Sequence, residues 1–104
     1  MDVVNYLYDQ TLQNYIPVDF LHDNPLFETL LINFLSKNLS IIHSQDYTHQ
    51  FILYLHYELD CLFYRLPKKD IQHDVNKIDN SRLRFEVKKL ANNIKKTYIN
   101  LTNN

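Results

Sequence analysis

The chain contains no glycine, and this absence constrains its fold more than any motif that is present. Glycine supplies about 7% of the residues in average proteins and adopts positive φ without steric cost. Phosphate-binding loops, dinucleotide-binding turns and nucleophile elbows all depend on it. The tight turns of β-hairpins also lose their preferred residue. The composition therefore favours helices, whose left-handed caps can be formed by asparagine.

The length and composition indicate one globular domain. A chain of 104 residues can bury a single core, and its 45% hydrophobic and 22% charged residues are typical of folded proteins. Cys61 is the single cysteine, which excludes an intrachain disulfide. The start, "MDVVNYLYDQ", lacks the basic segment of a signal peptide. We therefore expect one helical domain over residues 1–104, located in the cytoplasm.

The spacing of apolar residues predicts four or five helices. Positions three and four apart predict an amphipathic helix over residues 3–15, which ends before Pro17. Asn24 as N-cap and Pro25 at the first helical position predict a second helix to about residue 37. A third helix runs from a cap at Ser44 to residue 66. The prediction is an all-α protein, a small bundle with the third helix central.

The last third of the chain allows two interpretations. A helix could begin at Asp70, and a longer one after residues 79–81 carries apolar residues at helical spacing as far as Leu101. However, "RLRFEVK", Arg82 to Lys88, alternates polar and apolar residues as a half-buried strand does. The helix is favoured because its periodicity continues for five turns and a strand would lack a good partner.

The stretch "FILYLHYELDCLFYRL", residues 51–66, has two faces when wound as a helix. It is too short and too charged to span a membrane, so no membrane association is expected. One face is an aliphatic and phenylalanine stripe without charge, suited to a core. The opposite side, here called the tyrosine face, gathers Tyr47, Tyr54, Tyr57, Cys61 and Tyr64, with Glu58 and Arg65 at its edge.

Two fates are open to the tyrosine face. Its rings could be half-buried under neighbouring helices with their hydroxyls in water, which is common for tyrosine. Alternatively the face binds a protein, because tyrosine is enriched at interface hot spots. The candidate protein-binding residues are Tyr54, Tyr57, Tyr64 and Arg65.

Charge is strongly segregated along the chain. Residues 1–60 contain eight acids and one base, a net charge of −7, whereas residues 61–104 contain ten bases and four acids, a net charge of +6. On the expected last helix the bases form two rows beside a line of Phe85, Asn92 and Ile99. This pattern suits a nucleic-acid groove, an acidic protein or a second copy of the chain. It is equally typical of a solvated helix face that carries apolar residues by chance. The candidate residues are Arg82, Arg84, Lys88, Lys89, Asn92, Lys95 and Lys96.

Patterns that would indicate catalysis or metal binding are weak. His56 and Asp60 are spaced as two possible ligands, but a third ligand is not evident. Glu86 and Lys88, with Asp79 before them, match the E-x-K spacing of some nucleases, whose sites require strands. We therefore predict no catalytic site, no metal and no cofactor.

The sequence as a whole predicts a non-enzymatic protein-binding module. Inhibitors, immunity-type proteins, antitoxins and adaptors are of this kind, and the binding surfaces would be the tyrosine face and the basic last helix. A homo-oligomer is included among the expected partners. The alternative is a small nucleic-acid-binding regulator that uses the last helix.

Overall fold

The computed structural model describes residues 3–38, 45–64, 75 and 81–103, and for residues 45–48 the backbone alone. This part of the chain is all-α and contains no strand. Its elements are α1 (Val3–Gln10), the 3-10 helix η1 (Leu12–Asn14), α2 (Val18–Asp23), α3 (Leu26–Lys37), α4 (Gln45–Leu62) and α6 (Ser81–Thr102).

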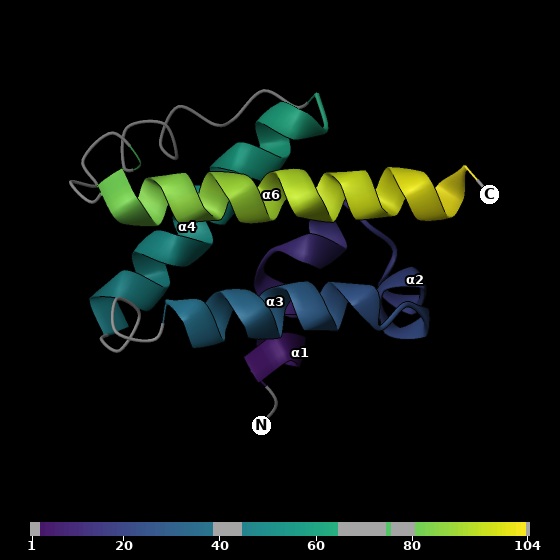
Figure 1. Cartoon of the computed structure of the whole chain (residues 1–104), viewed down its shortest axis with the longest axis horizontal. Coiled ribbons are helices and arrows are strands. Elements are labelled where there is room, and N and C mark those ends of the chain that lie inside the picture. The colour runs from purple at the N-terminus through teal and green to yellow at the C-terminus, as the bar shows by residue number, and fades with distance from the viewer. Residues whose placement is uncertain (1–2, 39–44, 65–74, 76–80, 104) are drawn as a thin grey trace.

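The two longest helices, α4 and α6, cross one another, and α6 also runs antiparallel to α3 (Figure 1). The most extensive helix packing joins α6 to α4 and α6 to α3. Phe34 of α3 in turn stacks on Phe51 of α4 at 4.9 Å between ring centroids. Helix α6 therefore packs on both α4 and α3, and the central place of the third helix stays a prediction.

The core lies where these three helices meet α1 and η1. Each element contributes side chains from one face, at the three- and four-residue spacing that amphipathic helices require. The largest fully buried side chains are Leu7, Leu12, Ile16, Leu21, Phe27, Leu31, Phe51, Leu55, Leu59, Val75, Leu83 and Ile94. Burial of each such side chain contributes about 1.5–3 kcal/mol before conformational entropy is subtracted.

The first predicted helix is interrupted at Thr11. Helix α1 ends at Gln10, and the chain continues as η1 rather than as one helix to residue 15. The Thr11 hydroxyl donates a hydrogen bond of 2.6 Å to the Leu7 carbonyl oxygen, which also accepts from the Thr11 backbone N–H. A threonine that bonds its own backbone in this way competes with helix continuation.

The connector expected between the first two helices contains a helix of its own, α2. Pro17 occupies its N-cap and Asp19 lies in its first turn, where a carboxylate is favoured. Asn24 does not cap α3 as predicted, because its side-chain amide donates to the Phe20 carbonyl oxygen at 2.8 Å. Helix α3 instead begins after Pro25 and ends at Lys37, where the sequence predicted its end.

Helix α4 ends at Leu62, four residues before the predicted end. Tyr64 follows in the left-handed region, with φ of 59°, a conformation that usually selects glycine. The Lys95 ammonium of α6 donates to the Leu62 carbonyl oxygen, one of the carbonyls left unpaired at the helix end. The end of α4 therefore coincides with a contact from another helix.

The strand interpretation of residues 82–88 is wrong, because α6 is a continuous helix from Ser81 to Thr102. The helix predicted to begin at Asp70 and the cap at Ser44 lie outside the described residues. Burial decided the outcome for α6. Its five buried residues follow helical spacing, which a strand could not place on one face.

The core assignment predicts a clear difference between Leu59 and Ile32. Leu59→Ala should lower the free energy of unfolding by about 2–5 kcal/mol, because Leu59 is fully buried and its truncation leaves a cavity. Ile32→Ala, at an exposed position of α3, should change it by no more than about 0.5 kcal/mol. Urea denaturation followed by circular dichroism measures both. Equal effects would contradict the packing of α4.

Candidate functional site

The solvent face of α6 carries the predicted basic residues in a regular row. The buried residues of α6 are Leu83, Val87, Leu90, Ala91 and Ile94. At about 100° per residue, the opposite side of the helix is centred on a row with alternating three- and four-residue spacing. This row, here called the α6 ridge, consists of Arg82, Phe85, Lys89, Asn92, Lys96 and Ile99, all of them exposed.

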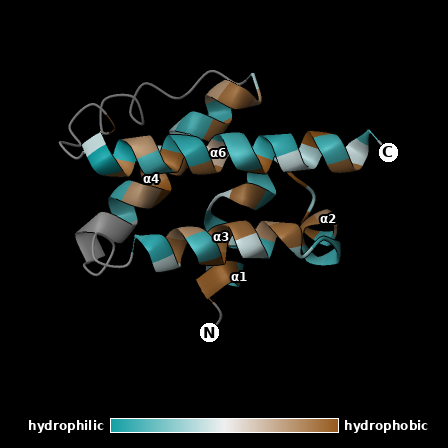
Figure 2. Cartoon of the chain, viewed as in Figure 1, coloured by the Kyte–Doolittle hydropathy of each residue, from teal (hydrophilic) through white to brown (hydrophobic). Residues whose placement is uncertain are grey.

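Two large apolar side chains of the α6 ridge are exposed to solvent. Phe85 is 61% exposed and Ile99 is 40% exposed. The Lys89 ammonium lies 5.4 Å from the centroid of the Phe85 ring, a cation–π contact. Figure 2 shows hydrophobic and hydrophilic residues alternating along the visible side of α6. The α6 ridge therefore combines bases with apolar side chains at one helical spacing.

The second basic row of α6 folds against α4. Arg84 donates from Nε to the Tyr54 hydroxyl, and its guanidinium lies 5.0 Å from the centroid of that ring. Lys95 contacts the Leu62 carbonyl oxygen and lies 4.4 Å from the Tyr64 ring centroid. Lys88 lies close enough to Glu58 to affect its ionisation. These three bases support the α4–α6 contact.

The seven residues predicted to bind nucleic acid thus divide into two groups. Arg82, Lys89 and Lys96 stay on the α6 ridge and form no ion pair within the part of the chain that the structure describes. Asn92 is also on the ridge, but its side-chain amide donates to the Lys88 carbonyl oxygen at 2.9 Å. Sequence reasoning did not include Phe85 and Ile99 among the site residues, although their alternation with the bases could have identified them.

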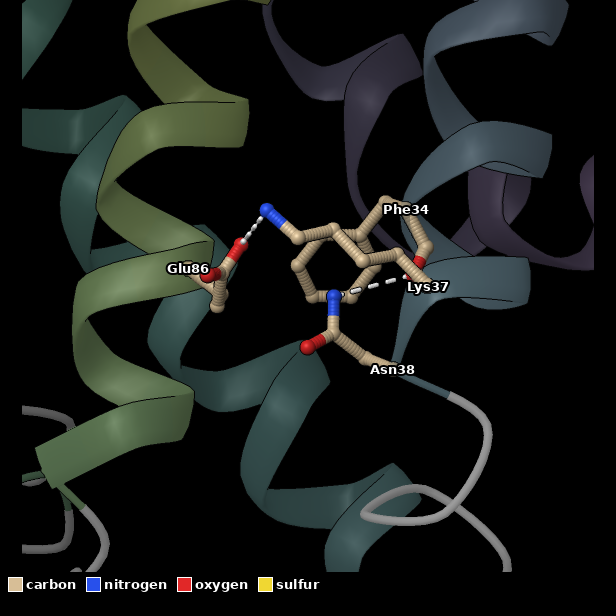
Figure 3. Close-up of polar contacts among 4 residues, drawn as sticks. All are labelled: Phe34, Lys37, Asn38 and Glu86. Carbon is tan, nitrogen blue, oxygen red and sulfur yellow. Dashed lines mark hydrogen bonds and ion pairs between the residues drawn. The ribbon is translucent and has the colours of Figure 1, made fainter.

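The acidic residue of α6, Glu86, points away from the α6 ridge. Figure 3 shows its carboxylate meeting the Lys37 ammonium at the end of α3, at 3.3 Å. Beside this pair the buried Asn38 amide donates to the Phe34 carbonyl oxygen at 3.0 Å. Glu86 therefore neutralises Lys37 and leaves the charge of the ridge uncompensated. The nuclease-like spacing of Glu86 and Lys88 is divided between two sides of a helix.

A hollow open to solvent lies beside the α6 ridge, between α6 and the end of α4. Its lining consists of Leu62, Asn92, Lys95, Lys96, Ile99 and Asn100. Because Lys95 also lies against the Tyr64 ring, the exposed tyrosine stands near this hollow. The α6 ridge therefore borders a depression on one side, where an inserted side chain would contact apolar, amide and cationic groups.

The residues of the tyrosine face do not form one exposed surface in the structure. Tyr54 is 2% exposed, so it presents almost no surface to a partner in this structure. The cause is the crossing of α6, which covers this part of α4 and brings Arg84 onto the ring. Tyr57 is half-buried and Tyr64 is 90% exposed. The side chain of Tyr47 and the whole of Arg65 lie outside the described residues.

Burial affects the ionisable groups between Tyr57 and α6. It raises the pKa of the Glu58 carboxyl, and the nearby Lys88 and Arg84 cations oppose this effect only in part. Burial, followed by the charges of Glu58 and Asp60, also raises the pKa of the Cys61 thiol. The pKa of the Tyr57 hydroxyl is also raised, mainly by electrostatic interaction with the neighbouring Cys61. These groups therefore remain protonated to higher pH than they would in water.

His56 and Asp60 are occupied by hydrogen bonds to the N-terminal part of the chain. The Tyr15 hydroxyl lies 2.5 Å from Asp60 Oδ1 and 3.2 Å from His56 Nδ1. His56 Nε2 lies 2.5 Å from the Gln10 carbonyl oxygen. No group of three metal-ligating side chains occurs among the described residues. The geometry therefore assigns this pair to the contact of α4 with the segment after α1.

The fate of the tyrosine face predicts opposite outcomes for Tyr54 and Tyr64. Tyr54→Ala should lower the free energy of unfolding by about 3–5 kcal/mol, as for other buried aromatics. Tyr54→Phe removes only the hydroxyl that Arg84 contacts and should cost about 0.5–1.5 kcal/mol. Tyr64→Ala should cost less than about 1 kcal/mol, because its ring is exposed. Chemical denaturation measures all three, and a stable Tyr54→Ala variant would contradict the burial.

A second prediction concerns the pH dependence that Glu58 confers. Because its folded-state pKa lies above the unfolded value, wild type loses stability as pH rises through that raised pKa. Glu58→Gln removes this loss, so the variant should melt at a higher temperature than wild type at pH 7. Below about pH 4 the difference should vanish, because wild-type Glu58 is protonated in both states.

Thermal unfolding at the two pH values measures the effect, with the exposed Glu28→Gln as the control. A Glu58→Gln variant that is less stable than wild type at pH 7 would contradict the prediction. That result would show that attraction to Arg84 and Lys88 outweighs the cost of burial.

The described helices were also compared with membrane spans and the chain with known proteins. No helix in the described ranges has the length and apolarity needed to cross a bilayer. Comparisons with protein-family models, curated proteins and solved structures found no match to this chain. The function is therefore inferred from the residues of the α6 ridge and their surroundings.

Proposed function

We propose that the chain is a non-enzymatic protein-binding module, and that the α6 ridge binds an acidic surface of its partner. The observation that carries this proposal is the exposed three- and four-residue spacing of Arg82, Phe85, Lys89, Asn92, Lys96 and Ile99. The lack of an enzymatic activity and the cytoplasmic location remain predictions from the sequence.

The spacing of the α6 ridge resembles the seam of a coiled coil. Bases occupy one of the two alternating positions, and Phe85, Asn92 and Ile99 occupy the other. Residues at such spacing face a partner helix along its whole length. At about 1.5 Å per residue, the ridge extends over about 26 Å. This length is sufficient to contact five turns of a partner helix.

The chemistry of the α6 ridge supports a protein partner with acidic residues. Phe85 and Ile99 supply apolar area, and truncation of a central interface anchor commonly costs 2 kcal/mol or more. The bases beside them steer an acidic partner and repel a basic one. The hollow between Leu62 and Ile99 offers space for one side chain of the partner.

Nucleic acid is the second candidate, since the exposed side of α6 carries no acid and Phe85 could stack on a base. Two contacts make it the weaker candidate. The Asn92 amide that would read a base edge is bonded to its own helix, and Arg84 and Lys95 are held against α4. Binding through the remaining cations would be sequence-independent and steeply dependent on salt.

Site-specific photo-crosslinking can test this function in cells that produce the protein. With p-benzoylphenylalanine in place of Asn92, at the centre of the α6 ridge, we expect crosslinks to a protein, removed by protease and resistant to nuclease. The same replacement of the exposed Ser36 on α3 is the matched control. Adding Phe85→Ala should weaken the captured complex by roughly thirtyfold.

Three results would contradict the proposal. Position 92 could crosslink no more than position 36, or the product could persist unchanged in the Phe85→Ala background. The product could also be sensitive to nuclease rather than protease, which would transfer the function to nucleic-acid binding. Circular dichroism of each variant verifies that the helices are retained.

A further inference from the structure

We propose that the partner of the α6 ridge is a second copy of this chain, which docks with its α2 corner. The α2 corner is defined as α2 and the first turn of α3, where Val18, Asp19, His22, Asp23, Leu26, Glu28 and Thr29 are exposed. This inference rests on the proposed function of the ridge as a protein-binding surface. It adds the identity of the partner and the surface that the partner uses.

The α2 corner carries three acids, and the basic residue within it is His22. Asp19 and Asp23 lie one turn apart on α2, and Glu28 lies in the first turn of α3. No lysine or arginine precedes Lys37 in the sequence. None of the three carboxylates forms an ion pair with any residue that the structure describes. The corner therefore presents three acids, which match the three bases of the α6 ridge in number.

The apolar residues of the two surfaces are also matched. Val18 and Leu26 are exposed on the α2 corner, as Phe85 and Ile99 are on the α6 ridge. Within the described residues, large exposed apolar side chains occur mainly at these two places, together with Val3, Ile32 and Tyr64. Each surface thus combines apolar side chains with one sign of charge, which is the complementarity that specific interfaces use.

Within one molecule, the α2 corner cannot contact the α6 ridge. Phe20 packs edge-on against Tyr98, at 5.2 Å between ring centroids, and Leu21 is buried. These contacts hold α2 beside the last turns of α6 on the core side, whereas the ridge lies on the opposite side of α6. The described residues include no ion pair between the corner and the ridge. Both charges are therefore available to another molecule.

A symmetric pairing of two α6 ridges is disfavoured by the same charges. In a parallel pairing Arg82, Lys89 and Lys96 would face the same bases of the other copy, and in either orientation the seam would gather six cations and no acid, which opposes association. Contact between a ridge and a corner is heterologous, so a pair of bound copies still has one free ridge on one copy and one free corner on the other. Association should therefore increase with concentration beyond a dimer and weaken with salt.

Exchange of the charges provides the decisive test, by sedimentation velocity of the full chain. The ridge variant carries Arg82→Glu, Lys89→Glu and Lys96→Glu, and the corner variant carries Asp19→Lys, Asp23→Lys and Glu28→Lys. At an ionic strength of about 0.01 M, where the Debye length is about 30 Å, wild type should shift to dimers and larger species as its concentration rises. Each variant alone should remain monomeric.

The equimolar mixture of the two variants should associate again, because the acidic ridge of one variant faces the basic corner of the other. Salt at about 1 M, where the Debye length is about 3 Å, should reduce every one of these associations. All the substitutions are at exposed positions, and unchanged helical circular dichroism verifies the fold.

The outcomes separate this inference from the proposed function. A wild type that stays monomeric, or a mixture that stays monomeric while wild type associates, overturns the ridge-to-corner contact. If position 92 still crosslinks to a different protein, the proposed function of the ridge stands and only the identity of the partner is wrong. If position 92 crosslinks to nothing and wild type is monomeric, both are wrong.

Discussion

The structure depends on the packing of one apolar row of α6 onto α3 and α4. Leu83, Val87, Leu90, Ala91 and Ile94 form this row. Rotation of α6 about its axis by one residue, about 100°, would expose much of the row and direct charged residues into the core. Each large apolar side chain lost from the core costs about 1.5–3 kcal/mol, so the orientation of α6 is well determined. The positions of the ridge and of the row that meets α4 follow from it.

The absence of glycine is compensated at the ends of the helices. Thr11 bonds the Leu7 carbonyl where α1 ends, and Asn38 bonds the Phe34 carbonyl where α3 ends. At the end of α4, Tyr64 adopts positive φ and Lys95 reaches across from α6 to the Leu62 carbonyl. Polar side chains and one strained tyrosine thus perform the role that glycine has in other proteins.

The regular parts of the fold could be predicted from the sequence, because periodicity reports which face is buried. The span of α3 and the helical nature of residues 82–101 were predicted correctly for this reason. The errors occurred where a tertiary contact or a short-range bond decides the outcome. A side-chain hydrogen bond accompanies the break at Thr11, and a contact from Lys95 accompanies the end of α4. Neither contact has a periodic signal.

The arrangement of the candidate site could be predicted from the sequence to the same extent as the fold. The basic rows and the line of Phe85, Asn92 and Ile99 follow from helical geometry alone, and the structure places them in the expected arrangement. Which basic row contacts α4 depends on where α4 crosses, and this cannot be read from α6. The burial of Tyr54 has the same origin, since one face of α4 was assigned to the core while α6 covers part of the other.

The side of α6 that contacts α3 and α4 and the side that faces solvent also differ in what their charged groups contact. Arg84 and Lys95 donate hydrogen bonds to α4, Lys88 lies near Glu58, and Glu86 pairs with Lys37 of α3. Through these contacts, the polar groups of α6 that face α3 and α4 interact within the fold. Within the described residues, the bases of the α6 ridge and the acids of the α2 corner form no ion pair, and they lie on different parts of the surface. A net charge of −1 therefore describes a molecule with separated surfaces of opposite sign.

Isolated exposed apolar residues are common on protein surfaces and indicate little by themselves. Phe85 and Ile99 differ because they lie in one row, at the spacing of a helical seam, between bases that the fold leaves unpaired. The same contacts that hold α6 in place turn this row outward. A surface so oriented adds little to the stability of the isolated chain, and its apolar side chains would be buried only by contact with another molecule.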